Sequence, residues 1–346
     1  MRTTYLAGVG LGLVAAVAFA SATTGPLFAR FLLMFVTPLP IALAGLGWGW
    51  RAAALAGAAG STLILVIVSP AVALAFLLTQ ALPMVLLTYL ALLSRPLAEG
   101  GAARAGNDDG ANAVEWYPAG RLVVWSAVIA GLMAIAMLML MGGDLEALRR
   151  ALADFIKTTL ENSLPTFKPT NDSVVPQGAS PPQYSDAEIA ALSEIALSAL
   201  PAASAMSWMA SLLFNLWLAG RITLASGQLG RPWPDLAAIT YPVGTPLAFG
   251  AMLFATMLTG YAGLAASAFA GGLSVAYLLL GLAILHFTTR GRPWRPFALW
   301  ALYLSVPLTQ FVTLIVIAML GLAETILHLR ARSVAPPASP PHHPDT

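Results

Sequence analysis

The segment Leu122–Gly143 contains no charged residue, and several other segments of this chain share that property. The hydrocarbon core of a bilayer is about 30 Å thick, and an α-helix needs about 20 apolar residues to cross it. Inside that core the backbone must satisfy its own hydrogen bonds, which an α-helix does within one segment. The sequence therefore predicts an all-α fold, a polytopic transmembrane helical bundle of about eight or nine spans.

The overall composition agrees with a protein that lipid surrounds. Hydrophobic residues make up 58% of the chain and charged residues 9%, whereas an ordinary soluble domain carries about 25% charged residues. The formal net charge is +2 and no basic run occurs, so the expected partner is the lipid bilayer and not nucleic acid. There is no cysteine and there are four histidines, so we predict no thiolate chemistry, no metal site and no cofactor.

Nine apolar segments are expected to be spans, with boundaries good to a few residues. They are 5–22, 28–47, 52–69, 71–94, 122–142, 196–220, 245–265, 268–288 and 297–327. The first also resembles a signal peptide, because Ala20-Ser21-Ala22 matches a small-residue cleavage site, and both readings stay open. The transmembrane helical domain is expected to occupy 1–333, and the Pro-rich tail 334–346 is expected to be disordered.

The arginines of the short loops set the expected orientation. With a cytoplasmic N-terminus, the loops 95–121, 221–243 and 289–296 all place their arginines in the cytoplasm. The expected location is therefore a bacterial inner membrane, crossed many times. Nine spans would leave Arg330 outside, against the rule, so a cytoplasmic C-terminus needs eight spans or a last helix broken near Pro307.

The segment 143–195 is expected to lie outside the membrane on the opposite side. Within it, Asp144–Glu161 places apolar residues at helical spacing opposite a charged face, which predicts an amphipathic helix on the membrane surface. Ser185 with Glu188 three residues later is a capping-box signature and predicts a second helix, bent near Pro201. Two roles stay open for this segment, a surface cover over the bundle or a lid or partner-docking element.

A short phrase occurs twice in the predicted cytoplasmic loops. Residues 230–234 read GRPWP and residues 291–296 read GRPWRP. An internal structural repeat, which is common in transporters, would explain why the phrase occurs twice. Basic loops with an interfacial Trp that arose independently would explain it equally.

The apolar part of the chain carries almost no chemistry. It lacks the H-E-x-x-H, G-x-S-x-G and P-loop signatures, and its acidic and basic residues lie near the ends of predicted spans, so an enzyme is not expected. What remains are neutral polar groups within spans, of which we take four as candidate substrate-binding residues: Gln80, Asn215, Tyr277 and Gln310. The alternative is that these groups form hydrogen bonds between helices.

Three stretches carry a resemblance to a known family. FVTPLPIALAGLGWGWR (Phe35–Arg51), EWYPAGRLVVW (Glu115–Trp125) and NLWLAGR (Asn215–Arg221) resemble YybS-like bacterial membrane proteins, a family of unknown function. That family is similar at a distance to the substrate-binding membrane components of energy-coupling-factor transporters. In those components, small residues four apart on an early helix contact the energising partner, and Ala16 and Ala20 match that spacing.

Two functional hypotheses follow. The first is a membrane protein that binds a neutral small molecule for transport, without an ATPase of its own and with energising subunits as partners. The second is a cell-envelope assembly or scaffold protein that works through contacts with other envelope proteins. An intramembrane enzyme has the least support, because no nucleophile–base pair or metal cluster is visible.

Overall fold

The computed structural model describes residues 2–22, 26–96, 114–140, 144–163, 184–309 and 312–330. These residues form a bundle of helices and one short antiparallel ribbon, in which β1 (Ser94–Pro96) pairs with β2 (Val114–Trp116). Seven of the described helices are long and apolar enough to cross a membrane. The predicted all-α helical bundle is confirmed, and the helices are compatible with a protein that crosses a membrane many times.

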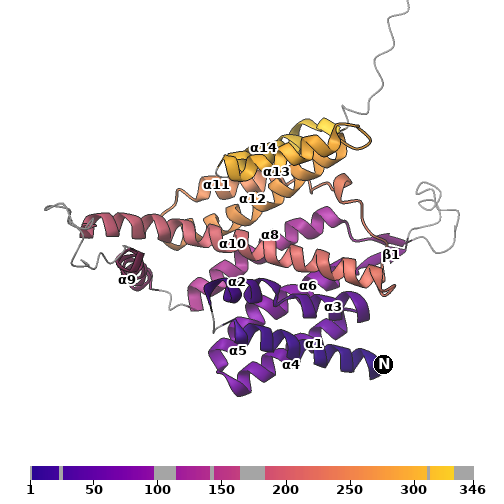
Figure 1. Cartoon of the computed structure of the whole chain (residues 1–346), viewed down its shortest axis with the longest axis horizontal. Coiled ribbons are helices and arrows are strands. Elements are labelled where there is room, and N and C mark those ends of the chain that lie inside the picture. The colour runs from indigo at the N-terminus through magenta and orange to yellow at the C-terminus, as the bar shows by residue number, and fades with distance from the viewer. Residues whose placement is uncertain are drawn as a thin grey trace, which may run out of the picture.

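The first half of the chain forms a tightly packed group of helices (Figure 1). These elements are α1 (Arg2–Ser21), α2 (Leu27–Val36), α3 (Leu39–Trp48), α4 (Trp50–Ile67), α5 (Pro70–Phe76), the π-helical turn η1 (Leu77–Ala81) and α6 (Leu82–Ala91). They match the first four predicted spans within a few residues. Pro38 precedes α3 and separates it from α2, because proline cannot donate the backbone hydrogen bond that a continuous helix needs.

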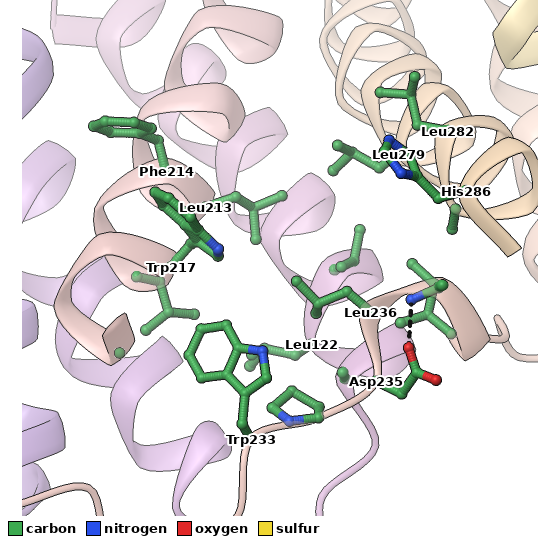
Figure 2. Close-up of a pocket in the computed structure, with 18 of the residues that line it drawn as sticks. Leu122, Leu213, Phe214, Trp217, Trp233, Asp235, Leu236, Leu279, Leu282 and His286 are labelled. Atoms are coloured by element: carbon green, nitrogen blue, oxygen red, sulfur yellow. Dashed lines mark hydrogen bonds between the residues drawn. The ribbon is translucent and has the colours of Figure 1, made fainter. Parts of the chain in front are cut away.

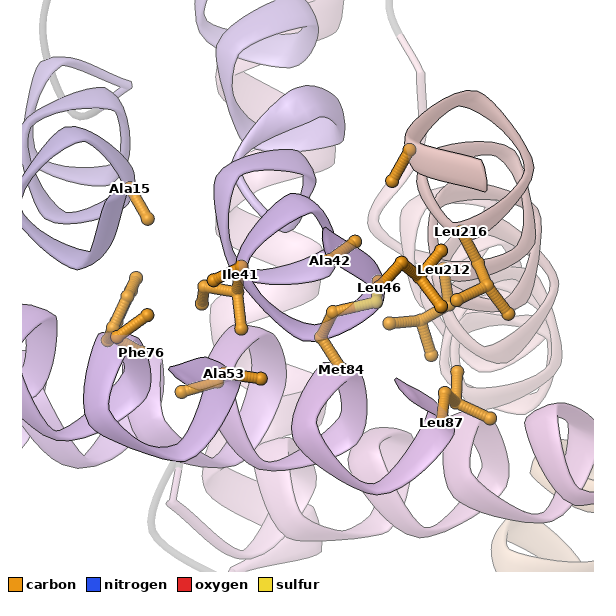
Figure 3. Close-up of a cluster of buried hydrophobic side chains, with 14 of the residues drawn as sticks. Ala15, Ile41, Ala42, Leu46, Ala53, Phe76, Met84, Leu87, Leu212 and Leu216 are labelled. Carbon is orange, nitrogen blue, oxygen red and sulfur yellow. The ribbon is translucent and has the colours of Figure 1, made fainter. Parts of the chain in front are cut away.

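Small residues let these helices touch through their backbones. A Cβ atom at Gly12 would overlap with the backbone of Ala56, and one at Gly60 would lie 2.8 Å from the carbonyl oxygen of Gly12. Close approach of this kind drives helix association where lipid removes the hydrophobic difference between partners. Larger side chains such as Leu46 and Met84 then fill the space between α3, α6 and the long helix that follows later in the chain (Figure 3).

The second half has longer helices and more interruptions. Its elements are α8 (Ala119–Leu140), α9 (Leu145–Ser163), α10 (Asp186–Ala225), the short 3-10 turn η2 (Leu236–Ala238), α11 (Thr245–Ala255), α12 (Gly260–Thr288), α13 (Arg295–Leu308) and α14 (Val312–Leu327). At 40 residues α10 is about 60 Å long, roughly twice the hydrocarbon thickness. It continues through Pro201, which is buried inside it.

The predicted amphipathic helix and capping box are both present. The helix is α9, and Arg149 on it forms a salt bridge of 2.7 Å with Glu194 on the beginning of α10. The Ser185 side chain accepts a hydrogen bond from the Glu188 amide, and the Glu188 carboxylate accepts one from the Ser185 amide. In Figure 1 the two helices form an arm at one end of the bundle, and its place on a membrane surface stays a prediction.

Two predicted spans differ from the structure. The segment 245–265 is not one helix, because α11 ends at Ala255 and α12 begins at Gly260, whose φ of 70° favours glycine. The segment 297–327 is broken between α13 and α14, as in the alternative with a break near Pro307. The hydroxyl of Thr309 accepts a hydrogen bond from the amide of Thr313 and so caps the new helix.

Before α11 the chain runs for some distance with little regular structure. This segment, 229–244, lies alongside α12 and the turn after it. Asp235 is bonded to Arg290, and the Tyr241 hydroxyl donates to the Ala276 carbonyl at 2.6 Å. An extended stretch followed by a short helix therefore replaces a complete span. The irregular backbone leaves polar groups that need partners, and residues of and beyond α12 supply several of them.

Arginines from segments far apart in the sequence lie at one end of the bundle. We call this end the basic face, and its arginines are Arg95, Arg231, Arg290, Arg295 and Arg330. Its loops are tied together, since Arg231 donates to the carbonyl of Ala91 and Arg330 donates to the carbonyls of Ala237 and Ile239. In Figure 1 the N-terminus lies at the same end as β1. The break between α13 and α14 brings the end of α14 back to this face, and the side of the membrane it occupies stays a prediction.

Candidate functional site

A groove of about 950 Å³ opens near the basic face between α10 and α12. Residues of α8 and of the segment 229–239 complete its lining (Figure 2). Its two main walls are formed by apolar and aromatic side chains, among them Leu213, Phe214 and Trp217 on α10 and Leu279, Leu282 and His286 on α12.

The groove arises from a change in the size of the facing residues. Gly271 lets the backbone of α12 touch that of α10 at Ala202, where a Cβ atom would lie 2.5 Å from the Ala202 carbonyl oxygen. Further toward the basic face, both helices present leucines and aromatic residues to the space between them. Phe214 and Trp217 are 41% and 45% exposed, so the walls are not sealed by neighbouring helices.

The irregular segment closes the end of the groove at the basic face. Gly220 has no side chain, so the Trp233 ring lies against it, and the Arg221 guanidinium stacks on that ring at 5.3 Å. Asp235 accepts two hydrogen bonds from Arg290, both of 3.0 Å, and one from the Ala237 amide. The Arg290 hydrogen bonds, followed by the Ala237 bond, lower the pKa of the Asp235 carboxyl, which is therefore ionised at neutral pH.

Arg231 lines the groove beside this pair. Its Nη1 donates to the Ala91 carbonyl at 2.8 Å, and its guanidinium lies over the ring of Trp116. Its Nε is buried and has no hydrogen-bond partner among the described residues. Desolvation lowers the pKa of Arg231, but an arginine stays protonated in proteins. The groove therefore has a partly buried cation in its wall.

A second basic cluster lies on the α12 side. The His286 Nε2 is 3.0 Å from the Tyr303 hydroxyl on α13, and its Nδ1 is 3.5 Å from Nη2 of Arg295. Both His286 and Arg295 line the groove. The imidazole thus joins α12 to α13 and holds the Arg295 side chain beside the same opening.

Three of the four predicted site residues, Gln80, Asn215 and Tyr277, do not line this groove. Gln80 lies in η1, where its Nε2 donates to Thr79 at 3.2 Å. Asn215 is fully buried and donates to the carbonyls of Phe35 and Ser211, both at 2.7 Å. Tyr277 is fully buried, with ring contacts to the two aromatic residues Tyr241 and Phe249. Gln310 lies outside the described residues.

Asn215 serves as a hydrogen-bond bridge between helices, which was the alternative prediction for these residues. Phe35 is one of the last residues of α2, so its carbonyl has no partner further along that helix. The amide of Asn215 supplies the missing donor. Gln80 and Asn215 each have a side-chain oxygen without a partner in the described structure, but they contact different helices.

The sequence signal nearest to the groove was the repeated phrase. Arg231 and Trp233 lie within the first copy and Asp235 directly follows it, while Arg290 directly precedes the second copy and Arg295 lies within it. The two copies meet through the bond between Asp235 and Arg290. The leucine and aromatic walls gave no signal, because their residue types are those of any lipid-facing helix.

Among the residues that the structure describes, no three His, Asp, Glu or Cys side chains are grouped in a way that would hold a metal ion. The groove offers binding contacts, and nothing in its lining pairs a nucleophile with a base. Searches of family models, curated proteins and solved structures find no match to this chain.

Proposed function

We propose that this protein binds a small molecule in the groove and acts as a transporter, or as the membrane component of a transporter whose ATPase is a separate subunit. The observation that supports this most is the groove itself. Its volume lies near the top of the range of about 300–1,000 Å³ that is usual for ligand sites, and such sites are mostly apolar with a few placed polar groups. That description fits a groove of leucine and aromatic walls with arginines at one end.

The broken helices favour the same function. Transporters often have interrupted helices and irregular backbone beside a site within the membrane. Here the segment 229–244 closes one end of the groove, and α13, which begins at the groove residue Arg295, is separated from α14 by a break. The proposal includes a bacterial inner membrane, a cytoplasmic basic face and membership of the YybS-like family.

The test is purification from native membranes in mild detergent, followed by mass spectrometry of the proteins and small molecules that stay bound. Leu279→Trp places an indole in the groove, and Leu132→Trp makes the same change on an exposed position of α8 as the matched control. We expect a specific small molecule with the wild type and the control, and its loss with Leu279→Trp. Equal retention in all three would disprove the groove as the site.

The arm formed by α9 and the start of α10 supports a second candidate, an envelope assembly or scaffold protein. α10 exceeds the length of a membrane span by about 30 Å, and the arm exposes large apolar residues such as Phe155 and Ile195. In the same purification, envelope proteins without any small molecule would favour this candidate. A co-purifying ATPase would favour transport.

A further inference from the structure

The charges around the groove are unbalanced. Arg231, Arg290 and Arg295 all contribute to its lining, and Asp235 is its one carboxylate within the described structure. Arg290 already holds that carboxylate through two hydrogen bonds. The two other arginines therefore have no acidic partner in the described lining.

Arg231 makes this imbalance costly. A charge that leaves water is unfavourable unless it gains an opposite charge or a complete set of hydrogen bonds. The guanidinium donates to two backbone carbonyls, those of Ala91 and Tyr117, yet its buried Nε has no partner within the described residues. An anion at the end of the groove would supply the counter-charge that the Arg231 guanidinium lacks in the described lining.

Arg295 approaches the same space from the other wall. Its contact with the His286 ring holds the side chain near the mouth of the groove, while Tyr303 holds the ring. Arginines on two sides of one opening suit an anionic group with several oxygen atoms, since guanidinium groups bind phosphate and carboxylate through paired hydrogen bonds.

A free small anion would match only the charged end of the groove and not the rest of its lining. Away from the arginines, the walls are leucine and aromatic side chains in the middle of two apolar helices. A ligand that used only the charged end would leave these walls uncovered, and a wholly apolar ligand would leave Arg231 unpaired. A molecule with an anionic head and a long apolar chain satisfies both parts.

We propose that the groove holds an anionic lipid, with its phosphate or carboxylate head between Arg231 and Arg295 and its chain along α10 and α12. This inference rests on the proposed function, since it names the ligand class of the same site. It also differs from the neutral ligand expected from the sequence. The head would lie at the ends of the helices and the chain among their apolar residues, as a lipid lies in a leaflet.

Lipid retention by the delipidated full-length protein, followed by native mass spectrometry, tests this assignment. The probes are phosphatidylglycerol and phosphatidylcholine with the same acyl chains, oleate, and inorganic phosphate as a competitor. We expect phosphatidylglycerol or oleate to bind at least tenfold more tightly than phosphatidylcholine. Displacement by millimolar inorganic phosphate would overturn the assignment, because the apolar chain would then contribute nothing.

Substitutions separate the head site from the groove. Arg231→Gln and Arg295→Gln should each weaken binding of the anionic probe about tenfold or more, the usual effect of losing a charged hydrogen bond. Arg231→Lys should retain most of it. Arg51→Gln is the control, because Arg51 is an exposed arginine at the start of α4 that stacks on Trp50 and does not line the groove.

Two failures can be told apart. If Leu279→Trp abolishes retention of both phospholipids but the two arginine variants change nothing, the groove is a ligand site and the assignment of an anionic head is wrong. If Leu279→Trp itself has no effect on any probe, both the assignment and the proposed function fail. Loss of folding in one arginine variant is recognised by its thermal unfolding, and Arg231→Lys then decides between charge and structure.

Discussion

The two halves of this bundle hold their helices together in different ways. In α1 to α6 the helices touch through glycine and alanine, and none of the described ion pairs lies within these helices. From α10 to α14 glycines such as Gly271 and Gly281 also bring backbones together, but here the helices are interrupted and charged or polar side chains bridge the gaps. Arg330 reaches two backbone carbonyls and a carboxylate, and the Tyr241 hydroxyl reaches the Ala276 carbonyl.

The difference follows from the continuity of the helices. A complete helix satisfies its own backbone, so only shape limits how closely it can pack. The irregular segment 229–244 leaves carbonyls that need donors from elsewhere, and Arg330 provides them for Ala237 and Ile239. Stability should therefore depend on side-chain size in the first half and on charge in the second.

The largest effect should come from Glu324, whose carboxylate is paired with Arg330 at 2.8 Å while the two side chains are 9% and 10% exposed. Glu324→Leu breaks a largely buried ion pair, which typically costs about 3–5 kcal/mol in unfolding free energy. Unfolding of the purified protein by a denaturing detergent measures the loss. Glu324→Leu combined with Arg330→Leu should recover much of it.

Glu146→Gln is the control for that experiment, because Glu146 pairs with Arg149 on the exposed surface of α9. An exposed pair of this kind contributes at most about 1 kcal/mol. Equal losses for Glu324→Leu and Glu146→Gln would contradict the view that the second half depends on a buried charge.

The sequence predicted the first half well because each span there coincides with one apolar run, even where Pro38 divides α2 from α3. It predicted one span at 245–265 where the structure has two helices, and for 297–327 it gave the observed break only as an alternative. Hydropathy counts apolar residues whether or not they continue a helix, and the breaks at Gly260 and Thr309 occur inside apolar runs. The glycine and Pro307 were visible as signals, but similar residues such as Pro201 lie within continuous helices.

The site was harder to predict than the fold. Asn215 stood out as a polar residue in an apolar span, yet it completes the hydrogen bonding of the end of α2. The groove consists of leucines and tryptophans that look like lipid-facing residues until the helices are placed. Only its charged end left a pattern, and Asp235 and Arg290 could not be paired without knowing that two loops meet.

An effect of intermediate size should come from Gly12, where a Cβ atom would overlap with the backbone of Ala56. Gly12→Ala should lower the free energy of unfolding by about 1–3 kcal/mol, the usual cost of overpacking. Gly10 lies one half-turn away with no atom within 4 Å of such a Cβ, so Gly10→Ala should be neutral or stabilising by up to about 1 kcal/mol. Thermal unfolding of both variants gives the comparison, and equal unfolding midpoints would show that α1 and α4 do not rely on this contact.

The smallest effect should come from the exposed pair of Asp235 and Arg290, and it should depend on pH. Arg290 lowers the pKa of the Asp235 carboxyl below its ordinary value of 3.8, so folding favours the ionised form. The stabilisation is therefore complete above pH 3.8 and is lost as the pH falls through the lower folded-state pKa. Asp235→Asn should unfold slightly earlier than the wild type at neutral pH, and the difference should vanish at an acidic pH below the folded-state pKa of Asp235. The Gly12→Ala difference arises from shape and should persist at both pH values, so a pH-dependent loss there, or a pH-independent one at Asp235, would remove the contrast between the two halves.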